Sequence, residues 1–155
     1  MRTVLLPDEL VLEYVLAEPT SFCLAIDQKR AVIIPLPAGE NEIEQVAERY
    51  LGQISAAKND DADARKLYDL LLGPIRQLPR TGRLTVVPDG AIWRLPIDAL
   101  RAPGGKYVLE SHTVSFAPSS TLLYCLRTLR HPVEPQMAFP RRGGCSLRPG
   151  AADEH

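Results

Sequence analysis

The 155-residue chain has little cysteine, no long apolar run and no excess of charge of either sign. Its three cysteines, Cys23, Cys125 and Cys145, are too few and too scattered for a disulfide framework or a zinc site. No segment approaches the ~20 apolar residues that a membrane-spanning helix needs. The three apolar residues before Pro7 do not form the core of a signal peptide. The sequence therefore predicts a protein of a reducing, cytoplasmic compartment.

The balance of charge excludes further classes of partner. Eighteen Lys and Arg residues against 19 Asp and Glu residues give a net charge of −1, which argues against binding to nucleic acid or a membrane surface by bulk electrostatics. The 45% hydrophobic and 24% charged fractions are ordinary for a globular protein. Proline is abundant: its 14 copies are about twice the usual share.

The first third of the chain has the alternating pattern of β-strands. Residues 10–16 alternate between two faces, residues 22–26 do so again, and residues 32–34 form a third apolar run. The connections between these runs are short, and Asp27-Gln28-Lys29-Arg30 forms a polar turn. This arrangement predicts an antiparallel β-meander.

Helical spacing follows, and then strands again. An apolar stripe from Ile43 to Ile54 predicts one helix, and Leu67, Leu70 and Leu71 predict a second that Gly73-Pro74 ends. Residues 83–87 and 113–116 are typical of strands. A last helix carries Leu122, Leu123, Leu126 and Leu129 on one face. The fold class expected is α/β. Periodicity ends beyond Pro132, so residues 140–155 are expected to form a disordered tail.

Five segments occur in the order found in the CHAT domain, a caspase-like domain related to separase that commonly follows tetratricopeptide repeats. They are Leu67-Tyr68-Asp69-Leu70-Leu71-Leu72-Gly73-Pro74, Leu84-Thr85-Val86-Val87-Pro88-Asp89-Gly90, Trp93-Arg94-Leu95-Pro96-Ile97-Asp98-Ala99-Leu100, Tyr107-Val108-Leu109-Glu110 and Val114-Ser115-Phe116-Ala117-Pro118-Ser119. The opening strand around Leu12-Glu13-Tyr14 also resembles the start of this family. The resemblance runs over residues 6–139 and implies a caspase-like sheet that follows the meander and the helices.

The resemblance also implies a peptidase mechanism whose catalytic residues are not found here. Members of the family carry a catalytic His and Cys after later strands, in the second half of the domain. The family-like pattern stops near Phe139, so no catalytic residue is assigned to any position. The expectation is a truncated, N-terminal portion of a cysteine-peptidase-like domain that is inactive alone. A frameshift or a shortened gene model would produce such an ending.

The cysteines and histidines of the chain also have simpler interpretations. Cys23 lies in an apolar alternating strand and Cys125 beside the leucine stripe of the last helix, which favours packing for both. Cys145 lies in the expected tail with nothing to orient it. His112 and His131 are interpreted as solvated polar residues, and His155 is the only other imidazole.

Three further segments suggest chemistry only weakly, and no cofactor or metal site is predicted. Gly104-Gly105-Lys106 lacks the spacing of a phosphate-binding loop and is read as a flexible loop. The acidic residues Asp60, Asp61 and Asp63 lack a calcium-loop pattern and are interpreted as a solvated helix start. Trp93 either walls a substrate cleft or anchors its irregular segment on the sheet, and the anchor is favoured.

A second hypothesis is a non-catalytic interaction module or scaffold. An α/β sheet that stops partway leaves an open strand edge and exposed apolar faces. Such an edge predicts a protein partner or self-association. A third possibility is a fragment without function.

Overall fold

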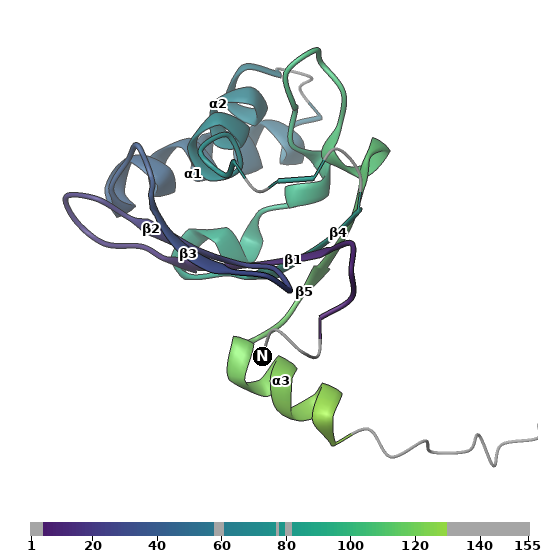
Figure 1. The fold of residues 1–155 in the computed structure, drawn as a ribbon. Coiled ribbons are helices and arrows are strands. Elements are labelled where there is room, and N and C mark those ends of the chain that lie inside the picture. The colour runs from purple at the N-terminus through teal and green to yellow at the C-terminus, as the bar shows by residue number, and fades with distance from the viewer. Residues whose placement is uncertain (1–4, 58–60, 77, 80–81, 130–155) are drawn as a thin grey trace, which may run out of the picture.

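The structure, a computed structural model, describes residues 5–57, 61–76, 78–79 and 82–129. It contains one five-stranded sheet with helices on both faces (Figure 1). The elements in chain order are β1 (Glu9–Val15), β2 (Phe22–Ile26), β3 (Ala31–Pro35), α1 (Glu40–Ser55), α2 (Asp61–Leu71), β4 (Gly82–Val87), the 3₁₀ helices η2 (Gly90–Arg94), η3 (Ile97–Ala99) and η4 (Val108–Glu110), β5 (His112–Phe116) and α3 (Ser120–Thr128). The expected boundary near Phe139 and the tail over 140–155 lie outside the described residues.

The sheet has the order β3-β2-β1-β4-β5, and it confirms the predicted α/β class. β1, β2 and β3 form the antiparallel meander, in which Cys23 lies opposite both Tyr14 and Ile34. β4 pairs in parallel with β1, and β5 pairs in parallel with β4. The sequence alternation predicted the meander because each strand is short and connected by few residues. Parallel pairing of β1 with β4 requires the long crossover that α1 and α2 provide.

The main core lies between the sheet and the layer of α1, α2 and the 3₁₀ helices, which Figure 1 shows above the sheet. Alternate strand residues point into it, including Leu12 from β1 and Val86 from β4. The stripe predicted for α1 is buried from Ile43 to Tyr50, whereas Ile54 in its last turn is exposed. Glu40 and Glu42 lie in the first turn of α1, where the helix dipole favours negative charge.

The opposite face of the sheet carries α3 and a smaller core. This smaller core consists of five buried residues, Leu5, Val11, Ile26, Val87 and Ala117. Leu24 and Leu123, which are partly buried, pack against them. No residue of α3 is buried. Of the leucines expected on one face of this helix, Leu122, Leu126 and Leu129 are 43%, 57% and 71% exposed. The helix instead turns Leu123 and Arg127, four positions apart, toward the sheet.

The end of β1 is joined to the end of β4 by one carboxylate. In the Pro88-Asp89-Gly90 turn, the Asp89 carboxylate accepts hydrogen bonds from the amides of Gly90 and Leu16, each 2.9 Å long. Gly90 adopts a positive φ of 48°, which glycine tolerates without strain. The turn signal in the sequence thus marks the place where two neighbouring parallel strands are held together.

Among the described residues, no helix combines the length and the apolar character that a membrane span requires.

Replacing Asp89 with Ala is expected to destabilise the fold by about 1–2 kcal/mol, because two amides lose their acceptor. Urea unfolding followed by circular dichroism would measure the change. Asp98→Ala removes an exposed carboxylate in η3 and serves as the matched control, with an expected change below about 0.5 kcal/mol. Equal stability of the two variants would show that Asp89 does not join the strands.

Candidate functional site

Cys23 occupies the main core, as its strand pattern predicts. Its side chain is fully buried beside Tyr14, whose hydroxyl donates to the Leu71 carbonyl at 3.0 Å. Burial raises the pKa of the Cys23 thiol to about 12, although a hydrogen bond with Tyr14 opposes the shift. A thiol with this pKa is almost entirely protonated near neutral pH, and the thiolate is the nucleophilic form. Cys23 is therefore a packing residue.

Cys125 does not pack as the sequence indicated. It lies half-buried in α3, because this helix contacts the sheet through only one face. Cys145, His131 and His155 lie outside the described residues.

His112 is held in place and is not the solvated residue that the sequence indicated. Its Nε2 lies 2.8 Å from the Pro79 carbonyl oxygen and its Nδ1 lies 2.8 Å from the Ser111 hydroxyl. A carbonyl oxygen only accepts, so Nε2 donates and, in the neutral ring, Nδ1 accepts from Ser111. Both ring nitrogens are thus engaged. Cys23 and His112 are also separated by β1 and β4, and three strand spacings of about 4.8 Å place them at least roughly 14 Å apart.

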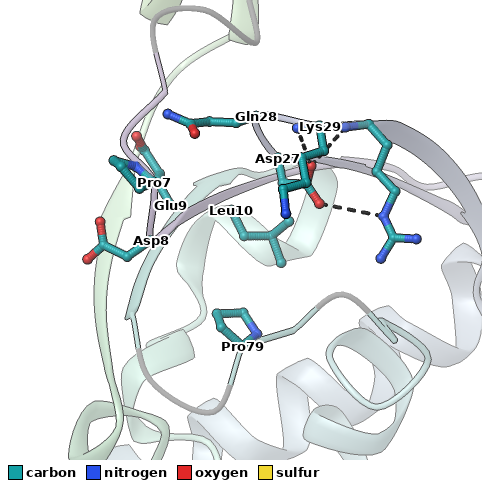
Figure 2. A pocket seen from close by; sticks show the side chains of 9 residues that line it. Pro7, Asp8, Glu9, Leu10, Asp27, Gln28, Lys29 and Pro79 are labelled. Atoms are coloured by element: carbon teal, nitrogen blue, oxygen red, sulfur yellow. Dashed lines mark hydrogen bonds and ion pairs between the residues drawn. The ribbon is translucent and has the colours of Figure 1, made fainter.

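A cavity of about 420 Å³ lies where β1 begins, beside the turn between β2 and β3 (Figure 2). Its lining includes Asp8, Asp27, Lys29 and Arg30. Burial by itself raises the pKa of Asp27, but the amides of Arg30 and Lys29 and the Arg30 guanidinium together hold the pKa below its usual value. The Asp27 carboxylate therefore stabilises the turn between β2 and β3. The cavity offers opposite charges at an open surface and no cysteine or histidine.

The segments that suggested phosphate or metal chemistry have other roles. Gly104 and Gly105 form a turn with positive φ of 90° and 80°, and Arg101 donates to the Gly105 carbonyl. Asp61 pairs with Arg101 at 2.9 Å, and Asp63 pairs with Arg49 at 3.1 Å. The two carboxylates therefore form ion pairs with different arginines. Asp60 lies outside the described residues.

Trp93 is not the anchor that the sequence favoured. It is 53% exposed in η2, whereas its neighbour Ile92 is fully buried in the main core. A 3₁₀ helix has three residues per turn, so Ile92 and Leu95 share the inner side and Trp93 points away.

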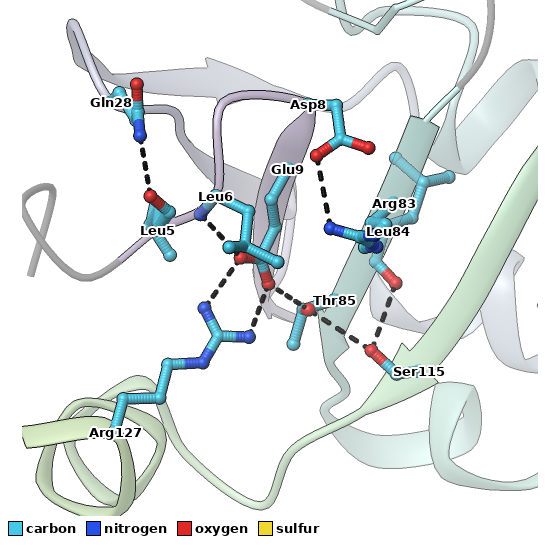
Figure 3. A network of polar contacts seen from close by, with 10 residues as sticks. All are labelled: Leu5, Leu6, Asp8, Glu9, Gln28, Arg83, Leu84, Thr85, Ser115 and Arg127. Atoms are coloured by element: carbon cyan, nitrogen blue, oxygen red, sulfur yellow. Dashed lines mark hydrogen bonds and ion pairs between the residues drawn. The ribbon is translucent and has the colours of Figure 1, made fainter.

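The polar network in Figure 3 joins α3 to the sheet. Glu9 is 4% exposed, and the Arg127 guanidinium binds both of its carboxylate oxygens at 2.6 Å. The same carboxylate accepts from the Thr85 hydroxyl at 2.7 Å and from the Leu6 amide at 3.1 Å. Because the Thr85 hydrogen goes to Glu9, Thr85 accepts from Ser115 at 3.1 Å.

These contacts determine the charge of Glu9. Burial by itself raises its pKa, but the hydrogen bonds from Arg127, Thr85 and the Leu6 amide together hold the pKa below its usual value. Glu9 is therefore an ionised, buried carboxylate at neutral pH.

A comparison with known protein families matches residues 61–141 to the CHAT domain, and this range covers just over half of the chain. The chain belongs to the CHAT domain family. No curated protein matches it. Within the CHAT match, the five segments of the resemblance form α2, β4 with its turn, the 3₁₀ helices, and β5 up to the start of α3. The opening strand, which also resembles the family, lies outside the matched range.

Sequence reasoning did not single out Glu9, Thr85 or Arg127. A signal was available: Glu9 opens a strand otherwise rich in apolar residues, and Arg127 follows Leu123 by one helical turn. Only the pairing of β1 with β4 and the position of α3 bring the three together, because Thr85 and Arg127 are distant from β1 in sequence.

Thiol alkylation tests the assignment of Cys23. Iodoacetamide at pH 8 is expected to modify half-buried Cys125 and to leave Cys23 unmodified, since a pKa of about 12 leaves little thiolate and burial blocks access. Mass spectrometry of tryptic peptides would locate the modified residue. Both cysteines should react in guanidinium chloride. Modification of Cys23 as fast as Cys125 in the folded chain would contradict the assignment.

Proposed function

We propose that this chain carries the N-terminal portion of a caspase-like CHAT domain, over residues 6–139, and that by itself it does not hydrolyse peptide bonds. A Cys–His mechanism needs a thiolate within hydrogen-bond reach of an imidazole. The protonated, buried state of Cys23 and the engaged ring of His112 support the proposal. The resemblance also places the catalytic His and Cys of the family after motifs that come later than any identified here.

The observation that carries this proposal is an uncovered surface on α3 and β5. We call it the α3–β5 surface, and it consists of Phe116, Leu122, Leu126 and Leu129, which are all exposed. Phe116 and Leu126 line the same cavity, and the three leucines follow one another along one side of the helix. Exposed apolar surface of this kind marks a place where further polypeptide packs. The family resemblance indicates that the remaining part of a CHAT domain would pack against the α3–β5 surface.

The proposal predicts no peptidase activity from the purified chain. Incubation with a peptide library, followed by mass spectrometry, should give no cleavage above a buffer control. Any trace of cleavage by a contaminant should persist unchanged in Cys125→Ala and Cys145→Ala variants. Cleavage that either substitution abolishes would contradict the proposal.

A second candidate function is a non-catalytic interaction module that binds a partner or a second copy through an open sheet edge. β5 is an edge strand of the sheet. The Gly82 amide donates to the Ser111 carbonyl, and the Ala117 amide donates to the Val86 carbonyl, so the main-chain groups of Ser111 and Ala117 face β4. Successive residues of a strand direct their main-chain N–H and C=O groups to opposite sides, so those of Val114 and Phe116 point toward the open edge. Main-chain groups that pair with no other described residue, beside exposed apolar side chains, favour strand pairing.

Sedimentation velocity distinguishes this function. Association through β5 predicts a species heavier than the 17.1 kDa monomer, which Phe116→Lys should convert to monomer by adding charge to the edge. Trp93→Lys changes another exposed aromatic residue, away from β5, and should leave association intact. A wild-type chain that stays monomeric at all concentrations would count against both candidate functions.

A further inference from the structure

The attachment of α3 to the rest of the protein is narrow. None of its nine residues is buried, and Leu123 is the one member that packs against the smaller core. Polar contacts between described residues add to this packing. Arg127 binds Glu9 through both carboxylate oxygens, and Ser120 donates to the Glu13 carboxylate. The position of the helix therefore depends mainly on charged and polar groups that water can replace.

The space beneath α3 is incompletely filled. A cavity of about 310 Å³ lies between the helix and the edge of the sheet, and it is lined by Thr85, Ser115, Phe116, Leu123, Leu126 and Arg127. Hydroxyl and guanidinium groups in this lining provide partners for water. The Glu9 side chain is 1% exposed beneath Arg127 of α3, whereas the Arg127 side chain is already 27% exposed. Departure of the helix would hydrate Glu9 and would not leave a buried charge unpaired.

The connection to β5 allows α3 to move as a unit. Ala117 stays with the sheet, because its amide donates to the Val86 carbonyl at 2.9 Å. Pro118 follows and has no amide to pair. Ser119 caps the helix from within, since its hydroxyl accepts from the Leu122 amide at 3.0 Å. The cap and the helix thus separate from β5 without the loss of a strand hydrogen bond.

We propose that α3 is a detachable flap, held over the sheet by the Glu9–Arg127 contact, whose release uncovers an apolar surface. The uncovered residues include Val11 and Val87 of the smaller core. In the register of β1 and β2, Val11 lies opposite Ile26 and Val15 lies opposite Phe22, so the new surface is continuous with side chains that are already exposed. This device is independent of the proposed function, because it rests on contacts within the chain.

Hydrogen exchange of the full chain, followed by mass spectrometry, tests the flap. Arg127→Gln should raise exchange in residues 120–128 at least tenfold and leave β1 and β4 unchanged. Arg127→Lys, which keeps the charge but not the two-oxygen contact, should give an intermediate rate. Arg83→Gln is the matched control, because Arg83 pairs with Asp8 at an exposed site nearby, and it should leave α3 protected. Fluorescence of 8-anilinonaphthalene-1-sulfonate should rise with Arg127→Gln and not with Arg83→Gln.

A second variant reaches the same state by an independent route. Leu123→Ala removes the apolar contact and keeps the Glu9–Arg127 pair, and it should also increase exchange selectively in α3. Two results would overturn the proposal. One is unchanged protection of α3 in both Arg127→Gln and Leu123→Ala. The other is joint loss of protection in α3, β1 and β4, which would show that the helix belongs to the cooperative core.

Discussion

The position of every other element depends on β1, which is hydrogen-bonded on both sides and covered on both faces. Leu12 faces the main core and Val11 the smaller one, because successive side chains of a strand point to opposite faces. β2 joins one side of β1 through a short connection, and β4 joins the other side after the crossover of α1 and α2. A carboxylate also makes a contact at each end of β1. Glu9 at its start accepts hydrogen bonds from Arg127 of α3, and Asp89 accepts one from the amide of Leu16, just after its end.

The two faces of the sheet are unequally covered, and this inequality governs the functional interpretation. α1 buries Ile43, Val46, Ala47 and Tyr50, whereas α3 buries none of its residues. An apolar stripe lowers the free energy of folding only where a second surface meets it. The α3–β5 surface lacks such a partner among the described residues, which supports both a CHAT domain completed by further polypeptide and an interaction through the open edge. The same thin cover makes α3 a candidate for detachment.

Local patterns predicted the elements well because they report local physics. The alternation in residues 10–16 and 22–26 predicted two strands, and the spacing from Ile43 to Tyr50 predicted a buried helix face. The incorrect expectations concern which side of an element meets the protein. Trp93 is exposed because a 3₁₀ turn directs Ile92 inward, and His112 is fixed because Pro79 supplies a carbonyl from a distant part of the chain. Neither outcome follows from strand or α-helix periodicity.

By itself, the sequence determined the strands of the meander, the helices and the ordered segments that mark the CHAT family, since each depends on residues close together in the chain. Only the tertiary structure decided which apolar stripes are buried and which charges meet. Glu9 and Arg127 are 118 positions apart, and their contact exists because the order β1-β4-β5 carries the chain across the sheet and returns α3 over β1. Pairing of this kind is fixed by strand order and by the face that a helix occupies, and local spacing contains neither.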